Sequence, residues 1–134
     1  MIFSRSTQYA IQALVRIVEE DEREYLTAGK LSEDLDIPNE FLSKLFQRLT
    51  KNGFLESRKG PGGGFKLARE PETIDLYEIV EMFEGPSPLS ECVFDGEKCS
   101  AKKQPCPLHE EWSKIREQII DFTKRNNLSE LAEN

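Results

Sequence analysis

The stretch from Ile37 to Leu67 most constrains the fold, because it predicts one amphipathic helix followed by a short hairpin. Over residues 38–51 the apolar side chains recur at helical spacing and fall on one side of a helix. These side chains are Phe41, Leu42, Leu45, Phe46 and Leu49. Asn52 and Gly53 end the helix, since glycine tolerates the left-handed conformation beyond a helix C-terminus. Residues 54–57 and 65–67 predict two strands, joined by a glycine-rich turn over residues 58–64.

The opposite face of this helix and the hairpin are polar and basic. That layout is typical of a winged helix-turn-helix, in which the helix enters the major groove of DNA and the hairpin reaches the backbone or the minor groove. We therefore expect contacts with double-stranded operator DNA from residues on both elements. They are Asn39, Glu40, Ser43, Lys44, Gln47, Arg48, Lys51, Arg58, Lys59, Gly60 and Gly62.

Charge is distributed unevenly along the chain. Residues 38–69 hold seven Lys or Arg against two acids, so this segment carries +5, whereas the whole chain carries −7 and the remainder therefore −12. A charged helix face is often only solvated surface, which is the competing interpretation. A localised basic patch on an acidic chain instead favours phosphate binding at one site, because phosphate contacts need clustered cations.

The residues before this stretch predict two further helices. Apolar residues from Tyr9 to Val18 mark a helix from Ser4 or Ser6 to about Glu20. Thr27 is a candidate N-cap for a short helix over residues 28–35. A turn at residues 36–38 then leads into the recognition helix, which is helix-turn-helix spacing.

Behind the hairpin, Asp75 and Glu78 form an Asp variant of the capping box for a helix over residues 76–84. We expect three parts: a winged helix-turn-helix over residues 1–84, a cysteine-bearing loop over 85–106, and a dimerisation helix with a tail over 107–134. The fold class is thus mainly α with a small β-hairpin wing. No apolar run is long enough for a membrane span and no leader is signalled, so we expect a cytoplasmic protein.

A long C-terminal helix is predicted from Pro107 to about Lys124. Its apolar residues recur at spacings of 4, 3, 4 and 3, which is a heptad seam that favours pairing with another helix. The seam consists of Leu108, Trp112, Ile115, Ile119 and Phe122. A monomeric core is the alternative. A reader with one recognition helix usually binds two half-sites as a dimer, which favours a homodimer.

Three cysteines and the single histidine of the chain lie within 18 residues. Cys92, Cys99 and Cys106 have six residues between successive members, and His109 follows Cys106 by three. Cys106 immediately precedes a predicted helix, whose N-terminus would stabilise thiolate charge. Zinc accepts three cysteines and a histidine but favours closely spaced pairs, whereas an iron–sulfur cluster tolerates wider loops. Unrelated cysteines beside a surface histidine are the remaining interpretation.

The run from Leu49 to Phe54, the run Arg58-Lys59-Gly60-Pro61-Gly62-Gly63-Gly64-Phe65 and the three cysteines together resemble the Rrf2 family of winged-helix regulators. The resemblance spans residues 4 to about 131. It implies a homodimer joined by the C-terminal helix, and a repressor or activator whose operator affinity depends on cluster occupancy. The family includes the iron–sulfur cluster regulator IscR and the nitric-oxide sensor NsrR.

By this resemblance Cys92, Cys99, Cys106 and His109 are metal ligands, with a 2Fe-2S cluster as in the IscR type. The NsrR type holds a 4Fe-4S cluster with a carboxylate from the first helix of the other subunit, where this chain has Gln8. Each cysteine gap is one residue longer than in well-known IscR members. Ser43 replaces a glutamate that helps choose operators, and Lys59 replaces an arginine that enters the minor groove.

The expected function is a homodimeric, sequence-specific transcription regulator controlled by an iron–sulfur cluster, and not an enzyme. It would sense iron–sulfur status, redox state or nitric oxide. Two alternatives remain open. One is a winged-helix regulator with structural zinc or thiol-based sensing, and the other is a cluster-carrying redox protein, which would leave the +5 segment unexplained.

Overall fold

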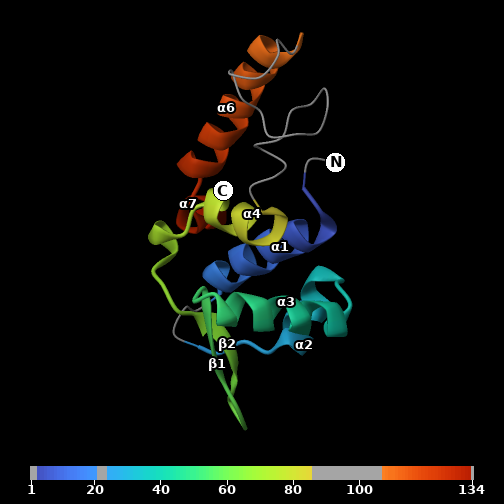
Figure 1. Ribbon diagram of the computed structural model, residues 1–134. Helices are drawn as coiled ribbons and strands as arrows, with labels where there is room; N and C mark the ends of the chain where they lie inside the picture. Colours follow the sequence, from blue (N-terminus) through green and yellow to red (C-terminus); the bar gives the residue numbers. More distant parts are fainter. Residues whose placement is uncertain (1–2, 21–23, 86–106, 134) are drawn as a thin grey trace.

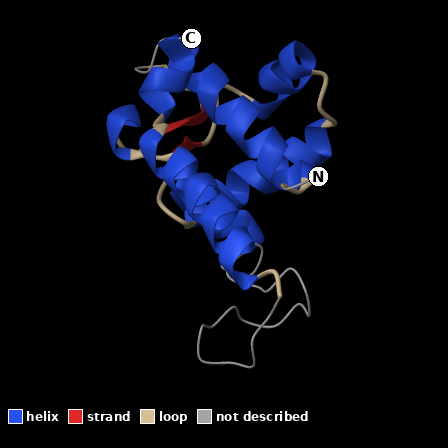
Figure 2. Cartoon of the chain, turned by 90° about the horizontal axis from the view of Figure 1, so that it is seen from above, coloured by secondary structure: helices blue, strands red, loops and turns tan. Residues whose placement is uncertain are grey.

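The structure is a computed structural model that describes residues 3–20, 24–85 and 107–133. It is mainly helical, with one antiparallel pair of strands (Figures 1 and 2). The described elements run in the order α1 Arg5–Glu19, α2 Ala28–Leu35, α3 Asn39–Lys51, β1 Leu55–Arg58, β2 Gly64–Leu67, the 3₁₀ turn η1 Pro71–Thr73, α4 Leu76–Glu84, α6 His109–Arg125 and α7 Leu128–Glu133. This confirms the predicted fold class. None of the described helices is long and apolar enough to cross a bilayer.

Helix α1 lies at the centre of the body. The Ser4 hydroxyl caps its N-terminus by accepting a hydrogen bond from the backbone N–H of Thr7 at 3.3 Å. Its buried residues are Thr7, Ala10, Ala13, Leu14 and Ile17. Helix α1 contacts α3 and α2 as well as α4 and α7. It therefore joins the helix-turn-helix to the C-terminal elements.

The helix-turn-helix consists of α2 and α3, as predicted. The Thr27 hydroxyl caps α2 by accepting from the N–H of Lys30 at 3.2 Å. Asp36 ends α2 in the left-handed conformation with φ of 54°. Ile37 is buried, and its carbonyl accepts a hydrogen bond from the Ser32 hydroxyl at 2.5 Å. The turn is thus held by its own polar contacts and by one apolar side chain in the core.

Helix α3 ends in a Schellman motif that sets the start of the hairpin. Gly53, with φ of 84°, donates to the carbonyl of Thr50 at 3.1 Å, and Phe54 donates to that of Leu49 at 3.0 Å. Because the N–H of Phe54 serves the helix end, β1 begins at Leu55. β1 thus begins and ends one residue later than predicted, whereas β2 begins one residue earlier than predicted and ends at Leu67 as predicted.

The β1–β2 hairpin, hereafter the wing (residues 55–67), pairs Leu55 with Leu67 and Arg58 with Gly64. The base of the wing makes a further contact that the sequence pattern does not predict. Leu26, just before α2, forms an isolated antiparallel bridge with Phe65, with N···O distances of 2.9 and 2.8 Å. This two-bond bridge ties the wing to the start of the helix-turn-helix.

Helix α4 begins at the Asp75 cap, whose carboxylate accepts from the N–H of Glu78 at 2.9 Å. At its other end the Glu84 carboxylate accepts from the backbone N–H of Ser4 at 2.7 Å and from the Thr7 hydroxyl at 2.5 Å. Desolvation raises the pKa of Glu84, but the hydrogen bonds from Ser4 and Thr7 outweigh it and the pKa is lowered. Ionised Glu84 thus fastens the end of α4 to the start of α1.

Helix α6 extends from the body on the side opposite the wing (Figure 1). The chain then returns to the body as α7, which packs on α1. Leu128, at the start of α7, is fully buried, and its N–H donates to the carbonyl of Ile74 at 3.0 Å. The sequence predicts only a tail here, because a six-residue helix gains its stability from such tertiary contacts and not from local signals.

Replacing Gly64 by alanine should destabilise the fold at the wing base. Gly64 has φ of 138°, and a Cβ there would overlap the backbone carbonyl of Leu26. We expect Gly64→Ala to lower the free energy of unfolding by about 1–3 kcal/mol. Gly29, in α2, has open space around its Cβ position, so Gly29→Ala should raise that free energy by about 0.5–1 kcal/mol. Urea unfolding of both variants measures this; equal effects would contradict the close approach.

Candidate nucleic-acid interface

One face of α3 and the wing together form a surface that most of the predicted DNA-contacting residues share. On α3 the exposed members are Asn39, Glu40, Lys44, Gln47 and Lys51, and Ser43 is half-buried among them. The opposite face of α3 buries Leu42, Leu45, Phe46 and Leu49 in the core. The apolar face thus holds α3 in the core, and the exposed polar face is accessible to a ligand.

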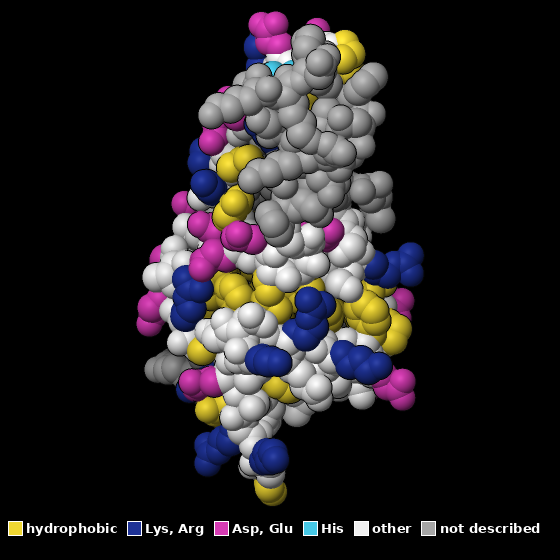
Figure 3. Space-filling view, in the orientation of Figure 1, with side chains coloured by type: hydrophobic (Ala, Val, Ile, Leu, Met, Phe, Trp, Pro, Cys, Tyr) yellow, Lys and Arg dark blue, Asp and Glu magenta, His cyan; other side chains and the backbone are white. Residues whose placement is uncertain are grey.

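A groove of about 430 Å³ runs between α3 and the wing. It is lined by Gln47, Thr50, Lys51, Ser57, Arg58, Lys59, Gly64 and Phe65. We call these residues, together with the exposed face of α3, the reading surface. Figure 3 shows Lys and Arg side chains gathered over α3 and the wing, in the lower half of the view. Thr50 and Ser57 were not predicted from the sequence, because their short hydroxyl side chains carry no charge and break no periodicity.

The wing uses one of its cations internally and leaves others at the surface. Lys66 pairs with Glu56 at 3.3 Å, and its Nζ lies 4.9 Å from the ring centroid of Tyr25. The Tyr25 hydroxyl in turn donates to Glu56 at 3.2 Å. Within the described residues Lys44, Lys51, Arg58 and Lys59 form no ion pair. The cations along the groove therefore remain available to phosphates.

The turn of the wing exposes backbone as well as cations. Gly60 and Gly62 both have positive φ, 87° and 74°, and both are exposed. Arg58 and Lys59 precede this turn and are also exposed, with the Arg58 guanidinium 5.9 Å from the Tyr25 ring centroid. Such a narrow, cationic tip can approach a DNA backbone or minor groove closely.

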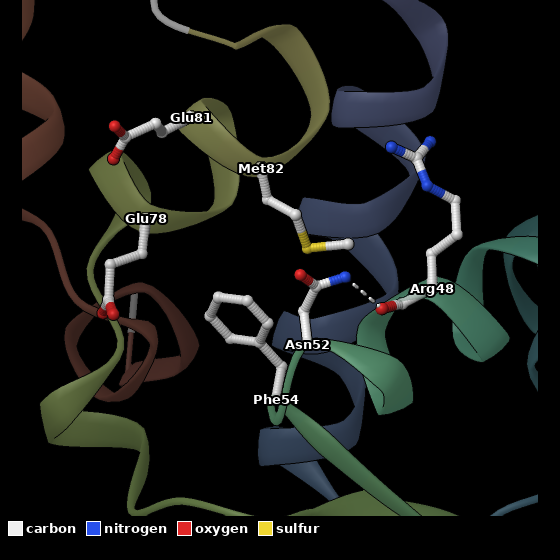
Figure 4. A pocket seen from close by; sticks show the side chains of 6 residues that line it. All are labelled: Arg48, Asn52, Phe54, Glu78, Glu81 and Met82. Carbon is white, nitrogen blue, oxygen red and sulfur yellow. Dashed lines mark hydrogen bonds between the residues drawn. The ribbon is translucent and has the colours of Figure 1, made fainter.

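Arg48 differs from the other predicted contacts. It is exposed, but its guanidinium carbon lies 4.6 Å from the centroid of the Phe83 ring of α4. It lines a second cavity, on the α4 side of α3, with Asn52, Phe54 and Met82 (Figure 4). Arg48 thus lies at the edge of the polar arc of α3, where helical periodicity alone assigns it equally well to either side.

The predicted metal ligands fall in two parts of the chain. Cys92, Cys99 and Cys106 lie outside the described residues. His109 is the first residue of α6 and is half-buried, and the exposed Leu108 precedes it. Within the described ranges no cluster of three potential metal-ligating residues occurs. The helix begins at His109, two residues after the predicted start at Pro107, so His109 lies in its first turn.

Comparison with known proteins places this arrangement in a family. The family model Rrf2, described as an iron-dependent transcriptional regulator, matches residues 3–134. The chain belongs to the Rrf2 family. It is 35% identical over 132 residues to an HTH-type transcriptional regulator from Aquifex aeolicus, covering 98% of this chain and 91% of the relative. It is 30% identical to the regulator IscR of Xenorhabdus nematophila, covering 95% of this chain and 76% of IscR.

Solved structures show the same Rrf2 fold. CymR, the global cysteine regulator of B. subtilis, superposes with a TM-score of 0.83 at 21% identity, covering 98% of this chain and 95% of CymR. IscR of T. potens has a TM-score of 0.79 at 22% identity, covering 97% and 85%. At these identities the likeness establishes the fold. The family match and the curated relatives show that the chain is a DNA-binding transcription regulator and not an enzyme.

Removing one wing cation should change the salt dependence of DNA binding. The probe is a duplex that the wild-type protein selects from a random-sequence pool, hereafter the selected duplex. We expect Lys59→Ala to weaken binding and to reduce the slope of log K against log salt by about 0.9, the effect of one lost phosphate contact. Lys114→Ala, an exposed change on α6, is the matched control and should leave the slope unchanged. Equal slopes for Lys59→Ala and wild type would contradict a phosphate contact by the wing.

Proposed function

We propose that this Rrf2 regulator acts in the cytoplasm as a homodimer whose affinity for operator DNA is controlled by an iron–sulfur cluster. The cluster would be held by Cys92, Cys99, Cys106 and His109. The observation that carries the proposal is this donor set. Three thiolates and one imidazole, spaced too widely for the paired knuckles of structural zinc sites, match the donors of a 2Fe-2S cluster with mixed ligation.

The described part of the donor set fits this assignment. His109 opens α6, and the positive end of the helix dipole at that point favours the net negative charge of thiolate-bound iron. The family description as iron-dependent and the relatives named IscR support the same cofactor. When bound, the cluster would supply a redox- and ligand-sensitive centre whose assembly or loss changes local charge.

The protein's own residues would carry such a change to DNA. In sequence, residues 86–106 connect Gly85 at the end of α4 with the start of α6. At that end of α4, Glu84 is bonded to Ser4 and Thr7 at the start of α1. A cofactor affects DNA binding only if it binds two states of the protein differently. The elements positioned to differ are α4 and α6.

The same donor set predicts how regulation is lost. A variant with Cys92, Cys99 and Cys106 all changed to Ala should no longer hold the cluster, and circular dichroism verifies that its helix content matches that of the wild type. It should also lose any difference in affinity for the selected duplex between cluster-loaded and cluster-free preparations. The measurement is fluorescence anisotropy under anaerobic conditions, with Lys114→Ala carried alongside as a loaded control.

Three results would contradict cluster control. Loaded and cluster-free wild type could bind the duplex equally, or the triple variant could retain the difference. Alternatively, zinc could restore the loaded affinity without iron. A response to thiol oxidants in the absence of any metal would instead favour the thiol-based alternative.

The homodimer proposal rests on the exposed apolar stripe of α6. Leu108, Ile115 and Phe122, each seven residues from the next, are 41%, 50% and 47% exposed. Trp112 and Ile119 lie between them and are half-buried. Large apolar side chains at heptad spacing along a projecting helix match a helix–helix interface between two copies. Two reading surfaces would then face two half-sites.

A charge placed on this stripe should separate the two copies. Ile115→Glu would bury an unpaired carboxylate in the interface, so we expect the dimer dissociation constant to rise about tenfold or more. Sedimentation velocity measures it, and circular dichroism verifies that helix content persists. Gln118→Glu introduces the same carboxylate at an exposed polar position of α6 and should leave the dimer intact. A dimer that survives Ile115→Glu would rule out this interface.

A further inference from the structure

A gap separates the recognition helix from α4. A cavity of about 490 Å³ lies between the C-terminal half of α3 and α4, lined by Arg48, Asn52, Phe54, Glu78, Glu81 and Met82 (Figure 4). The backbones of α3 and α4 make few close approaches across it. The orientation of α3 relative to α4 therefore depends on the packing of both helices on α1 and on side chains that reach across the gap.

Two arginines span this gap. On one side the Arg48 guanidinium of α3 covers the Phe83 ring of α4 at 4.6 Å. On the other side Arg69, which follows the wing, donates to the Glu78 carboxylate of α4 at 2.9 and 3.2 Å and lies 5.6 Å from the Phe54 ring centroid. Arg48 has no carboxylate partner within the described residues, so the Phe83 ring is its contact.

The same edge of α3 carries a second aromatic contact. Phe41, seven residues before Arg48, meets the Tyr9 ring of α1 edge-on with centroids 5.5 Å apart. Residues seven apart on a helix lie two turns apart on one edge. Phe41 therefore anchors the first half of α3 to α1, and Arg48 anchors the second half to α4.

We propose that Arg48 is a positioning residue, which sets the angle of α3 through Phe83 and does not contact DNA phosphate. This assignment rests on α3 being the reading helix. It revises the sequence expectation that grouped Arg48 with Lys44 and Lys51. Those two lysines lie on the exposed face of α3, whereas the guanidinium of Arg48 is directed at α4. The contact also links the reading helix to α4, the helix that leads toward the cysteines.

The proposal predicts equal and non-additive losses from the two partners. Arg48→Met and Phe83→Leu keep apolar bulk but remove the cation or the aromatic face. Each should weaken binding to the selected duplex by about two- to fivefold, the range of an exposed cation–π contact. The double variant should lose no more than either single variant, since one contact is removed in all three. Binding to a scrambled duplex should change less, because it depends on charge and not on helix angle.

Two further readouts separate positioning from a general structural defect. Phe83→Trp restores an aromatic face and should restore wild-type affinity, whereas Met82→Leu, on the same cavity, should leave affinity unchanged throughout. The slope of log K against log salt for Arg48→Met should equal that of wild type. A phosphate-contacting arginine would instead reduce it by about 0.9.

The outcomes that overturn the proposal are distinct. A reduced salt slope for Arg48→Met would make Arg48 a phosphate contact, and additive losses in the double variant would show that Phe83 does not act with it. Phe83→Leu could also weaken binding by lowering the thermal midpoint. In that case the affinity of Phe83→Trp is the deciding measurement, and an affinity below that of wild type would contradict positioning. Unchanged affinity of Lys44→Ala for the selected duplex would show that α3 is not the reading helix. That result would contradict the proposed DNA contacts as a whole, and not only the role of Arg48.

Discussion

Burial of α1 between the helix-turn-helix and the C-terminal helices is the interaction on which the rest of the structure depends. Ala10 and Ala13 are fully buried together with Leu14, and the two small side chains let neighbouring helices pack closely on α1. α3 packs on this helix from the reading side, and α4 and α7 pack on it from the other. Two exposed ends, the wing and α6, are therefore held by one small core. Because α3 and α4 both pack on α1, a shift of α4 on α1 would alter the packing of the reading helix.

Features that the sequence predicted correctly depend on local chemistry. Thr27 and Asp75 cap their helices as expected, because an N-cap hydrogen bond is satisfied within four residues. The apolar face of α3 also lies in the core, since helical periodicity alone assigns it. Features that were missed depend on residues far apart in sequence. The Leu26–Phe65 bridge joins segments 39 residues apart, and Leu128 is fixed by the carbonyl of Ile74.

The residues of the candidate site also differ in whether local spacing or a contact with a distant residue determines their position. Lys44, Gln47 and Lys51 could be assigned to one exposed helix face from spacing alone, and the structure places Gln47 and Lys51 beside the wing. Arg48 could not be assigned, because its direction is decided by a ring on α4, 35 residues away. The cysteines were found from composition and spacing. His109, the described member of that set, lies in the first turn of α6, which begins two residues after the predicted Pro107.

The charged side chains of the reading surface and those near α1 and α4 have different functions. The reading surface keeps four cations without ion-pair partners among the described residues, while Glu84 and Asp75 use their carboxylates to cap or fasten helices near α1 and α4. Acidic bulk away from the reading surface would disfavour indiscriminate contact with DNA. Site-specific binding then depends on the angle of α3, the reach of the wing and the spacing of two copies.

The central claim is that the cysteines and His109 hold an iron–sulfur cluster. It is tested most directly by the visible absorption spectrum of anaerobically purified protein, combined with analysis of iron, acid-labile sulfide and zinc. The account predicts a brown protein with about two irons and about two sulfides per chain. Colourless protein that binds no iron after reconstitution, or that holds stoichiometric zinc, would contradict it.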